Sequence, residues 1–238
     1  MNIALIGYGK MGHEIEQIAL NRGHMIVAKI DLNTTDSFTS ESFLKADVAI
    51  EFTRPEVAVS NVLSCFEAKV PVVCGTTGWA DKMYSVKAEM ARQDGTLFWA
   101  SNFSLGVNLF FALNGYLAKI MNKYTDYNVS MVEVHHTQKL DAPSGTAITL
   151  AESILKELDR KTTWVKELES KPEELAIASI REGTVPGIHE VIYESEMDSI
   201  SIKHDAKTRR GFALGAVIAA EFTAGKKGFL SMSDLMQF

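Results

Sequence analysis

The chain has 238 residues, of which 46% are hydrophobic and 23% charged, an ordinary globular composition with length for one large domain or two small ones. The formal net charge is -6 with acidic and basic residues interspersed, which excludes the clustered basic stripe of a nucleic-acid-binding surface. The two cysteines form no disulfide or metal pattern. The sequence shows neither a signal peptide nor an apolar run near the roughly 20 residues of a membrane helix. We therefore expect a cytoplasmic protein without nucleic-acid or membrane partners.

The first hundred residues alternate between apolar strands and helices. We predict strands at residues 2–7, 25–31, 46–52, 70–75 and 96–101, with helices at 10–22, after Pro55, and at 81–92. Strands alternating in this way with helices indicate a Rossmann-type, doubly wound parallel sheet.

The pattern changes in the second half to that of an α+β domain with an open mixed sheet. A long apolar helix is predicted at 106–121, a strand at 128–136 and a helix at 144–158, and then strands in mixed, mostly antiparallel order at 175–181, 189–195 and 199–204. The charged run 156–174 is predicted to be a solvated helix end and a loop. The apolar helix 211–223 is expected to pack back on the first domain, which gives two domains, residues 1–102 with 209–238 and residues 103–208.

A glycine-rich turn follows the first strand. Gly7-Tyr8-Gly9-Lys10-Met11-Gly12 matches G-x-G-x-x-G, in which the first glycine permits a tight turn, the second lets backbone approach a pyrophosphate, and the third lets helix pack on strand. A plain turn is the alternative, but the second strand ends in Asp31, where a carboxylate would bind the ribose hydroxyls of a dinucleotide. No arginine follows Asp31 to hold a 2′-phosphate, which favours NADH, while Lys10 and Lys29 leave NADPH open.

Three more loops follow strands of the same predicted sheet. They are Phe52-Thr53-Arg54-Pro55, Gly75-Thr76-Thr77-Gly78 and Ser101-Asn102-Phe103-Ser104. The second of these suits a nicotinamide ribose or amide, with a plain turn as the alternative. Because ligands bind outside the carboxyl ends of strands in open α/β sheets, we expect the three loops to line one crevice.

Residues 133–147 read EVHHTQKLDAPSGTA and gather several groups that can donate a proton or carry positive charge. His135 and His136 end a strand, so their side chains point to opposite faces and need different roles. Glu133 shares the face of His135 and is placed to orient it. A histidine with a reference pKa of roughly 6.5 can deliver a proton at neutral pH.

The second part of the same segment resembles an anion site. Ser144 fits a helix N-cap, and the amides of Gly145 and Thr146 with Lys139 beside them suit a carboxylate. Ser144 as a cap only, and Asp141 as a turn residue only, remain open alternatives. Cys74 is considered as a nucleophile because it precedes a glycine turn. No role is assigned to the residues that lie apart from the cluster, which are His13, His24, His189 and Cys65.

The stretch EVHHTQKLDAPSGTA closely resembles the signature of the dihydrodipicolinate reductase (4-hydroxy-tetrahydrodipicolinate reductase) family of the lysine and diaminopimelate pathway. The segments GYGKMG, EFTRP, CGTTGW, SNFSLGVN and REGTVPGIHEV occur in the family's order and at suitable spacing. The resemblance therefore spans essentially the whole chain. Residues 204–211 match the family pattern only in part, which leaves the role of Arg209 open.

The resemblance implies a role for each motif. His135 would be the proton donor, with Lys139 as its partner and a second candidate acid. The substrate's carboxylates would be held by His136, Lys139, Ser144, Gly145 and Thr146. The dinucleotide would be bound by Gly7, Gly9, Lys10, Met11, Gly12, Asp31, Phe52, Thr53, Gly75, Thr77, Ser101, Asn102 and Phe103.

The resemblance also implies the reaction and the assembly. A nicotinamide cofactor, NADH by preference or NADPH, and no metal, would reduce a cyclic unsaturated dicarboxylate after loss of water and give tetrahydrodipicolinate. The first domain would bind the dinucleotide, and the second would bind substrate and join a homotetramer through its open sheet.

Two rival hypotheses are considered. The first is an aspartate-semialdehyde dehydrogenase, which needs an activated cysteine, whereas Cys74 lacks an adjacent histidine. The second is a dinucleotide sensor without catalysis, which would not need His135 and Lys139.

Overall fold

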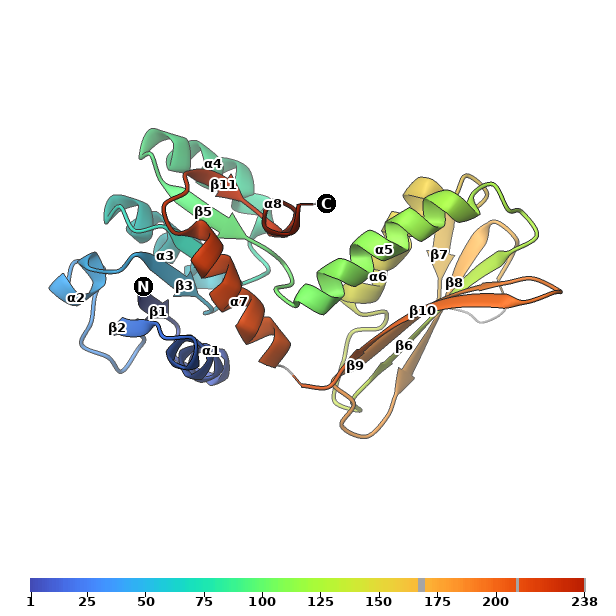
Figure 1. Ribbon diagram of the computed structural model, residues 1–238, viewed down its shortest axis with the longest axis horizontal. Coiled ribbons are helices and arrows are strands. Elements are labelled where there is room, and N and C mark those ends of the chain that lie inside the picture. Colours follow the sequence, from blue (N-terminus) through green and yellow to red (C-terminus); the bar gives the residue numbers. More distant parts are fainter. Residues whose placement is uncertain (167–169, 209, 238) are drawn as a thin grey trace. The chain divides into compact units, whose positions relative to one another are not determined.

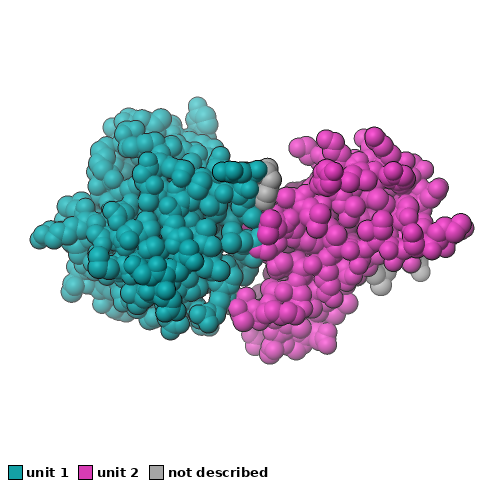
Figure 2. Space-filling model, viewed as in Figure 1, with its two compact units in different colours: residues 1–105, 210–238 teal, residues 106–209 magenta. Residues whose placement is uncertain are grey.

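The computed structural model describes residues 1–166, 170–208 and 210–237. The chain divides into two compact units, Met1–Leu105 with Arg210–Phe238, and Gly106–Arg209, which are coloured separately in Figure 2. Arg209, whose role the sequence leaves open, lies outside the described residues.

The first unit is built on a six-stranded parallel sheet in the order β11-β5-β4-β3-β1-β2 (Figure 1). The chain reverses its direction of winding at β1, so the carboxyl ends of β1 and β3 lie at the switch point where open α/β sheets bind ligands. The strands are β1 (Asn2–Ile6), β2 (Met25–Ile30), β3 (Val48–Glu51), β4 (Val72–Cys74), β5 (Thr96–Trp99) and β11 (Gly228–Leu230).

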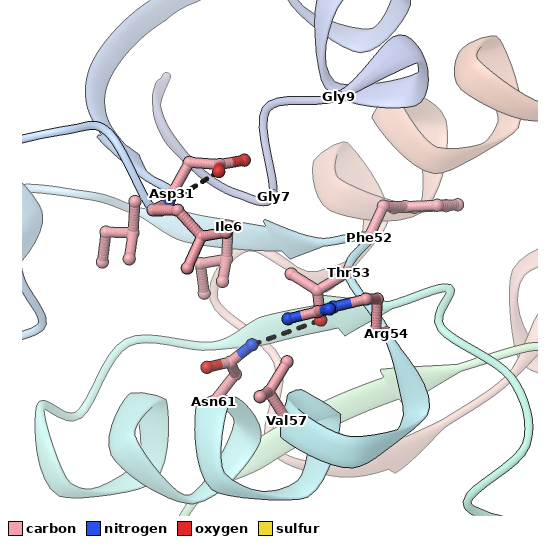
Figure 3. A pocket seen from close by; sticks show the side chains of 11 residues that line it. Ile6, Gly7, Gly9, Asp31, Phe52, Thr53, Arg54, Val57 and Asn61 are labelled. Atoms are coloured by element: carbon pink, nitrogen blue, oxygen red, sulfur yellow. Dashed lines mark hydrogen bonds between the residues drawn. The ribbon is translucent and has the colours of Figure 1, made fainter.

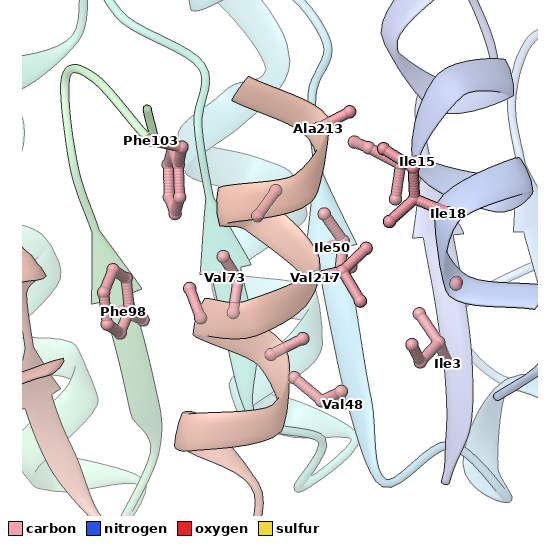
Figure 4. Close-up of a cluster of buried hydrophobic side chains, with 14 of the residues drawn as sticks. Ile3, Ile15, Ile18, Val48, Ile50, Val73, Phe98, Phe103, Ala213 and Val217 are labelled. Carbon is pink, nitrogen blue, oxygen red and sulfur yellow. The ribbon is translucent and has the colours of Figure 1, made fainter. Parts of the chain in front are cut away.

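Helices cover both faces of this sheet, which explains why the central strands are mostly apolar. One face packs on α1 (Lys10–Asn21) and α7 (Arg210–Thr223), and the other packs on α3 (Pro55–Glu67) and α4 (Met83–Arg92). Figure 4 shows α7 laid over the strands, with Ala213 and Val217 among the apolar side chains of β1, β3, β4 and β5. The short elements are α2 (Glu41–Leu44), the 3-10 helix η1 (Ala80–Lys82) and α8 (Met232–Met236).

The second unit has a five-stranded mixed sheet in the order β10-β9-β6-β8-β7. Its strands are β6 (Asn128–His135), β7 (Thr163–Val165), β8 (Glu174–Arg181), β9 (Gly187–Glu194) and β10 (Ser199–Ala206). Helices α5 (Leu105–Met121) and α6 (Gly145–Glu157) supply the apolar residues that cover one face of this sheet. The parallel sheet of the first unit and this second, mixed sheet confirm the predicted fold class.

The direction of β8 differs from the mostly antiparallel order expected of the later strands. β8 runs parallel to both β6 and β7, whereas β9 is antiparallel to β6 and β10. The reason is the connection: α6 lies between β6 and β8, and a helical crossover returns the chain to start a parallel strand. This crossover puts the ends of β6 and β8 at the same edge of the sheet, with His135 opposite Arg181.

The charged run 156–174 is more ordered than a solvated loop where the structure describes it. It contains β7, and its Lys161 is buried with the side-chain Nζ donating to Asn128 Oδ1 and to the carbonyls of Pro172 and Glu174, each at 2.8 Å. The prediction missed β7 because three residues carry too little periodicity to signal a strand. Among the described residues, no helix is long and apolar enough to cross a membrane.

Candidate active site

The first unit has two adjoining pockets at the carboxyl ends of β1 to β4, with volumes of about 460 and 400 Å³. They share Gly9, Phe52 and Thr53, so the loops after β1 and β3 border both. The larger pocket is lined by Ile6, Gly7, Gly9, Ile30, Asp31, Leu32, Phe52, Thr53, Arg54, Val57 and Asn61 (Figure 3). The smaller is lined by Gly9, Lys10, Met11, Phe52, Thr53, Pro55, Gly75, Thr76 and Thr77.

The glycine turn has the geometry that its sequence predicts. Gly7 has a φ of +91°, and a Cβ there would lie 2.1 Å from the carbonyl oxygen of Phe52. A Cβ at Gly12 would lie 2.4 Å from the carbonyl oxygen of Gly7, so this glycine lets α1 start close to β1. A Cβ at Gly9 would meet nothing within 4 Å, which leaves its backbone open to the pocket. Gly12 itself packs behind the pockets and lines neither.

Asp31 borders the larger pocket at the end of β2, as Figure 3 shows. Its Oδ2 accepts a hydrogen bond from the Tyr8 amide at 2.5 Å, and its Oδ1 accepts one from the Leu32 amide at 2.6 Å. These bonds tie the carboxylate to the glycine turn. Since each carboxylate oxygen has a second lone pair, Asp31 can still accept from ribose hydroxyls.

The positively charged side chains near this pocket differ from those considered in the sequence analysis. Lys29 is engaged elsewhere, because its Nζ pairs with Glu16 at 2.7 Å and donates to the Tyr8 hydroxyl at 2.9 Å. Arg54, in the loop after β3, lines the same pocket as Asp31 (Figure 3). The sequence analysis expected the loop that contains Arg54 to line the crevice but considered an arginine for the 2′-phosphate only directly after Asp31, and the pairing of β3 with β1 brings Arg54 to the same edge.

The loop after β5 lines neither pocket. Asn102 Oδ1 accepts from the Ser104 amide at 2.9 Å, and Ser101 follows the strand directly. Phe103 is buried in the core, with its ring centroid 5.6 Å from that of Phe52. The structure therefore places Phe103 behind Phe52, where it supports a residue that borders both pockets.

Cys74 lacks the surroundings of a nucleophile. It is fully buried, and its Sγ donates to Glu51 Oε2 at 3.0 Å. Burial, and then the neighbouring Glu51 carboxylate, raise the pKa of the Cys74 thiol well above its usual value. A protonated, inaccessible thiol cannot perform the acyl transfer of a semialdehyde dehydrogenase.

In the second unit, a buried carboxylate organises the end of β6. Both oxygens of Glu133 accept from the Ser144 amide at 3.1 Å, and Oε1 also accepts from Arg181 Nη2 at 3.2 Å. Oε2 lies 3.5 Å from His135 Nδ1 and 3.7 Å from His189 Nε2. Glu133, His135, Ser144 and His189 are all buried, so β6, β8, β9 and the start of α6 meet at one polar cluster, which we call the Glu133 cluster.

His189 was set apart from the site in the sequence, and that assignment is wrong. Its ring packs edge-on against His135 with centroids 5.0 Å apart, and its Nε2 lies 3.1 Å from Ser144 Oγ. The strand register causes this, because His189 on β9 is paired with Glu133 on β6. Arg181 was missed as well, and it enters through the pairing of β8 with β6.

Burial lowers the pKa of both histidines in this cluster. It lowers the pKa of His135, which the Glu133 carboxylate raises in part, and it lowers the pKa of His189 to about 4, helped by the nearby His135. For Glu133, burial raises the pKa, but hydrogen bonds from Ser144 prevail, and the net pKa is lowered. At neutral pH the cluster therefore combines an ionised glutamate with a neutral His189.

The loop after β6 carries Lys139, the positively charged residue that the sequence analysis placed at the site. Lys139 Nζ binds both carboxylate oxygens of Asp141, at 2.8 and 2.9 Å, and this bond leads the lowering of the Asp141 pKa. Arg181 braces the loop by donating to the Asp141 carbonyl at 2.6 Å and to the Lys139 carbonyl at 3.3 Å. His136 is half-buried just beyond the strand, whereas His135 lies on the helix-covered face with Glu133. The two histidines thus have different surroundings, as strand alternation predicts.

Ser144 is the N-cap of α6, since its Oγ accepts from the Ala147 amide at 3.2 Å. A helix start leaves its first amides without partners in the helix, and here these belong to Gly145 and Thr146. Gly145 is exposed, and a Cβ there would meet nothing within 4 Å. The helix start is therefore accessible to an anion.

The Glu133 cluster also resembles a two-histidine, one-carboxylate metal site. The donor atoms of Glu133, His135 and His189 lie within 4.8 Å of one another. However, the carboxylate already accepts from the Arg181 guanidinium, and this fixed positive charge opposes a divalent cation. The arrangement fits an ion-paired network better than a metal centre.

Fold and site together define a two-unit oxidoreductase of the nicotinamide-dependent class, with a Rossmann-type unit and an α+β unit that carries an acid-base cluster. The family models then give the particular family. The model described as dihydrodipicolinate reductase, N-terminus, matches residues 1–103, and the model described as dihydrodipicolinate reductase, C-terminus, matches residues 106–236. The chain belongs to the dihydrodipicolinate reductase family.

Individual relatives agree with this assignment. The chain is 48% identical to the 4-hydroxy-tetrahydrodipicolinate reductase of Christiangramia forsetii, over 99% of this chain and 98% of the relative. It is 36% identical to the 4-hydroxy-tetrahydrodipicolinate reductase of Caldanaerobacter subterraneus, over 96% of this chain and 95% of the relative. Among solved structures, the dipicolinate-bound dihydrodipicolinate reductase of Paenisporosarcina sp. TG-14 has the same fold, with a TM-score of 0.77, 24% identity and 98% coverage of both chains.

Proposed function

We propose that the protein catalyses the NAD(P)H-dependent reduction of 4-hydroxy-tetrahydrodipicolinate to tetrahydrodipicolinate in lysine and diaminopimelate biosynthesis. The observation that carries this proposal is the segment EVHHTQKLDAPSGTA, which delivers His135, Lys139 and the start of α6 to one end of the second sheet. A dinucleotide sensor would have no use for a buried acid-base cluster next to an anion site.

The first unit holds the dinucleotide in this proposal. When bound, the nicotinamide supplies the hydride. Gly7, Gly9 and the start of α1 receive the pyrophosphate, Asp31 the ribose, and the loops after β3 and β4 the nicotinamide end, through the residues that line the two pockets. Gly12 acts by close packing and Phe103 by supporting Phe52. Ser101 and Asn102 remain predicted cofactor contacts.

The second unit binds the cyclic dicarboxylate and supplies the proton. One carboxylate docks on the amides of Gly145 and Thr146, and Lys139 and His136 contribute positive charge or hydrogen bonds. His135 donates a proton to the ring as the hydride arrives, with Lys139 as the second candidate acid. Ser144 helps as the cap that fixes the helix start.

The cofactor preference follows from two groups in one pocket. Asp31 favours the free hydroxyls of NADH, because a 2′-phosphate beside a carboxylate is repelled. Arg54 lines the same pocket and can pair with that phosphate. We infer that NADH is preferred and that NADPH is also used.

The face of the second sheet opposite α5 and α6 supports the homotetramer that the family resemblance implies. Val134 on β6 pairs with Ile188 on β9 and Ile180 on β8, and these three side chains are not fully buried on the face opposite α5 and α6. A second copy of this sheet would cover them. The free, buried thiols of Cys65 and Cys74 are consistent with a cytoplasmic enzyme.

The test is a coupled assay. Pyruvate and aspartate semialdehyde are condensed by the synthase that makes the substrate, the protein is added, and oxidation of NADH and of NADPH is followed separately. Oxidation with both cofactors, faster with NADH, is expected. The double variant His135→Gln/Lys139→Ala should lose turnover and keep dinucleotide binding. A wild-type protein that binds NADH without oxidising it would support the sensor instead.

A further inference from the structure

Glu133 is the point where the proposed proton donor and the proposed carboxylate clamp meet. Its side chain is fully buried on β6, and both its oxygens accept from the amide of Ser144, the residue that starts the clamp helix. The same Oε2 lies 3.5 Å from Nδ1 of His135, an ion-pair contact without hydrogen-bond geometry, and Nδ1 has no hydrogen-bond partner among the described residues. One carboxylate therefore touches both halves of the site without being able to reach solvent.

The other ring nitrogen of His135 faces a different environment. Its Nε2 lies toward Gly187, the first residue of β9, where a Cβ would come within 3.1 Å of it. Any other residue at this position would crowd Nε2. The ring thus has a carboxylate on its Nδ1 side and, on its Nε2 side, a strand residue without a side chain.

We propose that Glu133 is a positioning residue for the reduction, which keeps His135 in the Nδ1–H tautomer, presents Nε2 as the atom that donates the proton, and increases the fraction of His135 rings that carry this proton. This inference rests on the proposed reductase function. In the step, the Nε2–H bond breaks, the proton goes to the ring of the substrate, and His135 becomes neutral with its Nδ1–H facing Glu133. The carboxylate itself stays ionised.

The surrounding charges show why His135 needs this partner. Burial, Lys139 and Arg181 all lower the pKa of His135, and Glu133, followed by Asp141, opposes them. Without the carboxylate, the pKa of His135 would be lower still. The titratable and charged groups that face His135 and its neighbour on β9 are Glu133, Lys139, Asp141, Arg181, His189 and His204.

His189 shares Glu133 without consuming its charge. Its Nε2 lies 3.7 Å from Oε2 and 3.1 Å from Ser144 Oγ, and its pKa of about 4 keeps it neutral at the pH of catalysis. A second imidazolium there would compete for the carboxylate and repel the one on His135. The neutral His189 therefore leaves the charge of Glu133 to His135.

The test is the pH dependence of kcat in Glu133→Gln. The amide oxygen can still accept from Ser144, but the charge is gone, so the alkaline limb of kcat is expected to move to lower pH by about one to three units. Turnover at neutral pH should fall at least about tenfold and recover on acidification. Glu190→Gln is the matched control, because Glu190 follows His189 on β9, points to the opposite face, and pairs with Lys203.

The outcomes separate this inference from the function it rests on. If wild type and Glu190→Gln turn over, the proposed reductase function is upheld. If the alkaline limb of the kcat profile of Glu133→Gln then lies at the same pH as that of wild type, only the role of Glu133 is overturned. Circular dichroism and NADH binding show whether Glu133→Gln folds. If it does not, nitrogen-15 NMR of the histidines in the wild type decides: a protonated Nδ1 in neutral His135 supports the proposal, and a protonated Nε2 overturns it.

Discussion

Two glycines of the turn after β1 are predicted to respond in opposite ways to the same added methyl group. In Gly12→Ala, the Cβ would lie 2.4 Å from the carbonyl oxygen of Gly7, so α1 has to move away from β1. In Gly9→Ala, the Cβ meets nothing within 4 Å, and the φ of -82° and ψ of -155° suit alanine. The first change strains the fold, and the second only occupies the pocket.

The magnitudes follow from these contacts. Overpacking against backbone at Gly12 costs about 1–3 kcal/mol and lowers the melting midpoint by roughly 3–10 °C. For Gly9→Ala, the reduced entropy of the unfolded chain offsets a slightly poorer helix start, so stability changes by less than about 1 kcal/mol. A methyl group where the pyrophosphate should approach weakens NADH binding at least tenfold, or about 1.4 kcal/mol.

Thermal unfolding followed by circular dichroism and NADH titration followed by fluorescence test the pair. Wild-type NADH affinity in Gly9→Ala would show that the pyrophosphate does not approach this residue, and the assignment of the two pockets to the dinucleotide would be wrong. An unchanged melting midpoint in Gly12→Ala would contradict the steric argument. Gly9→Ala should weaken NADH binding and spare the melting midpoint, so it is the control for the stability effect of Gly12→Ala.

Three further predictions concern charge and assembly. Arg54→Ala should raise KM for NADPH about five- to tenfold and leave KM for NADH nearly unchanged, since an exposed charge-assisted contact contributes about 1 kcal/mol; equal effects would refute it. The pKa of His189 is about 4 in the folded protein against about 6.5 in the unfolded chain. Its contribution to the free energy of unfolding is therefore complete above pH 6.5 and is lost by up to about 3 kcal/mol as the pH falls toward 4. In urea unfolding, the stability of His189→Asn should decline less with falling pH than that of wild type, and an equally steep decline would contradict this. Ile188→Lys should reduce the mass in light scattering below a tetramer, whereas an unchanged tetramer would place the interface elsewhere.

The chain order of strands and helices could be predicted because each element carries a strong local signal. The turn from Gly7 to Gly12, the proline at the start of α3 and Ser144 before α6 mark element starts by their own chemistry. Short elements escaped prediction, since a three-residue strand such as β7 has no periodicity to detect. Its existence depends on pairing with β8, which is a tertiary fact.

The partners in the Glu133 cluster were harder to predict than its central residues. His135 and Glu133 lie two apart on one strand, so alternation alone places them together. His189 and Arg181 arrive only through the register of β9 and β8 against β6, and a shift of one residue would turn both away. For the same reason Arg54 was not seen beside Asp31, because their proximity follows from the order of β2, β1 and β3.

A buried glutamate lies at or near the carboxyl end of a central strand in each unit, and the two differ in what surrounds them. Glu51 ends β3 beneath the larger pocket of the first unit and receives neutral donors, the thiol of Cys74, the hydroxyl of Thr53 and the amide of Asn61. Thr53 and Asn61 also line that pocket, so Glu51 fixes part of a binding surface. Because a buried carboxylate is stable only when its lone pairs are satisfied, both glutamates hold loops in place.

Of these two glutamates, only Glu133 has basic partners among the described residues, which are the Arg181 guanidinium and the imidazoles of His135 and His189. Burial and the Glu51 carboxylate keep a neighbouring thiol protonated and inert, whereas the Glu133 carboxylate faces an imidazole, whose pKa it raises against the effect of burial and which can exchange a proton. The first unit has to recognise a cofactor that brings its own chemistry. In the proposed reaction the second supplies a proton, and the buried carboxylate next to a histidine is found in that unit.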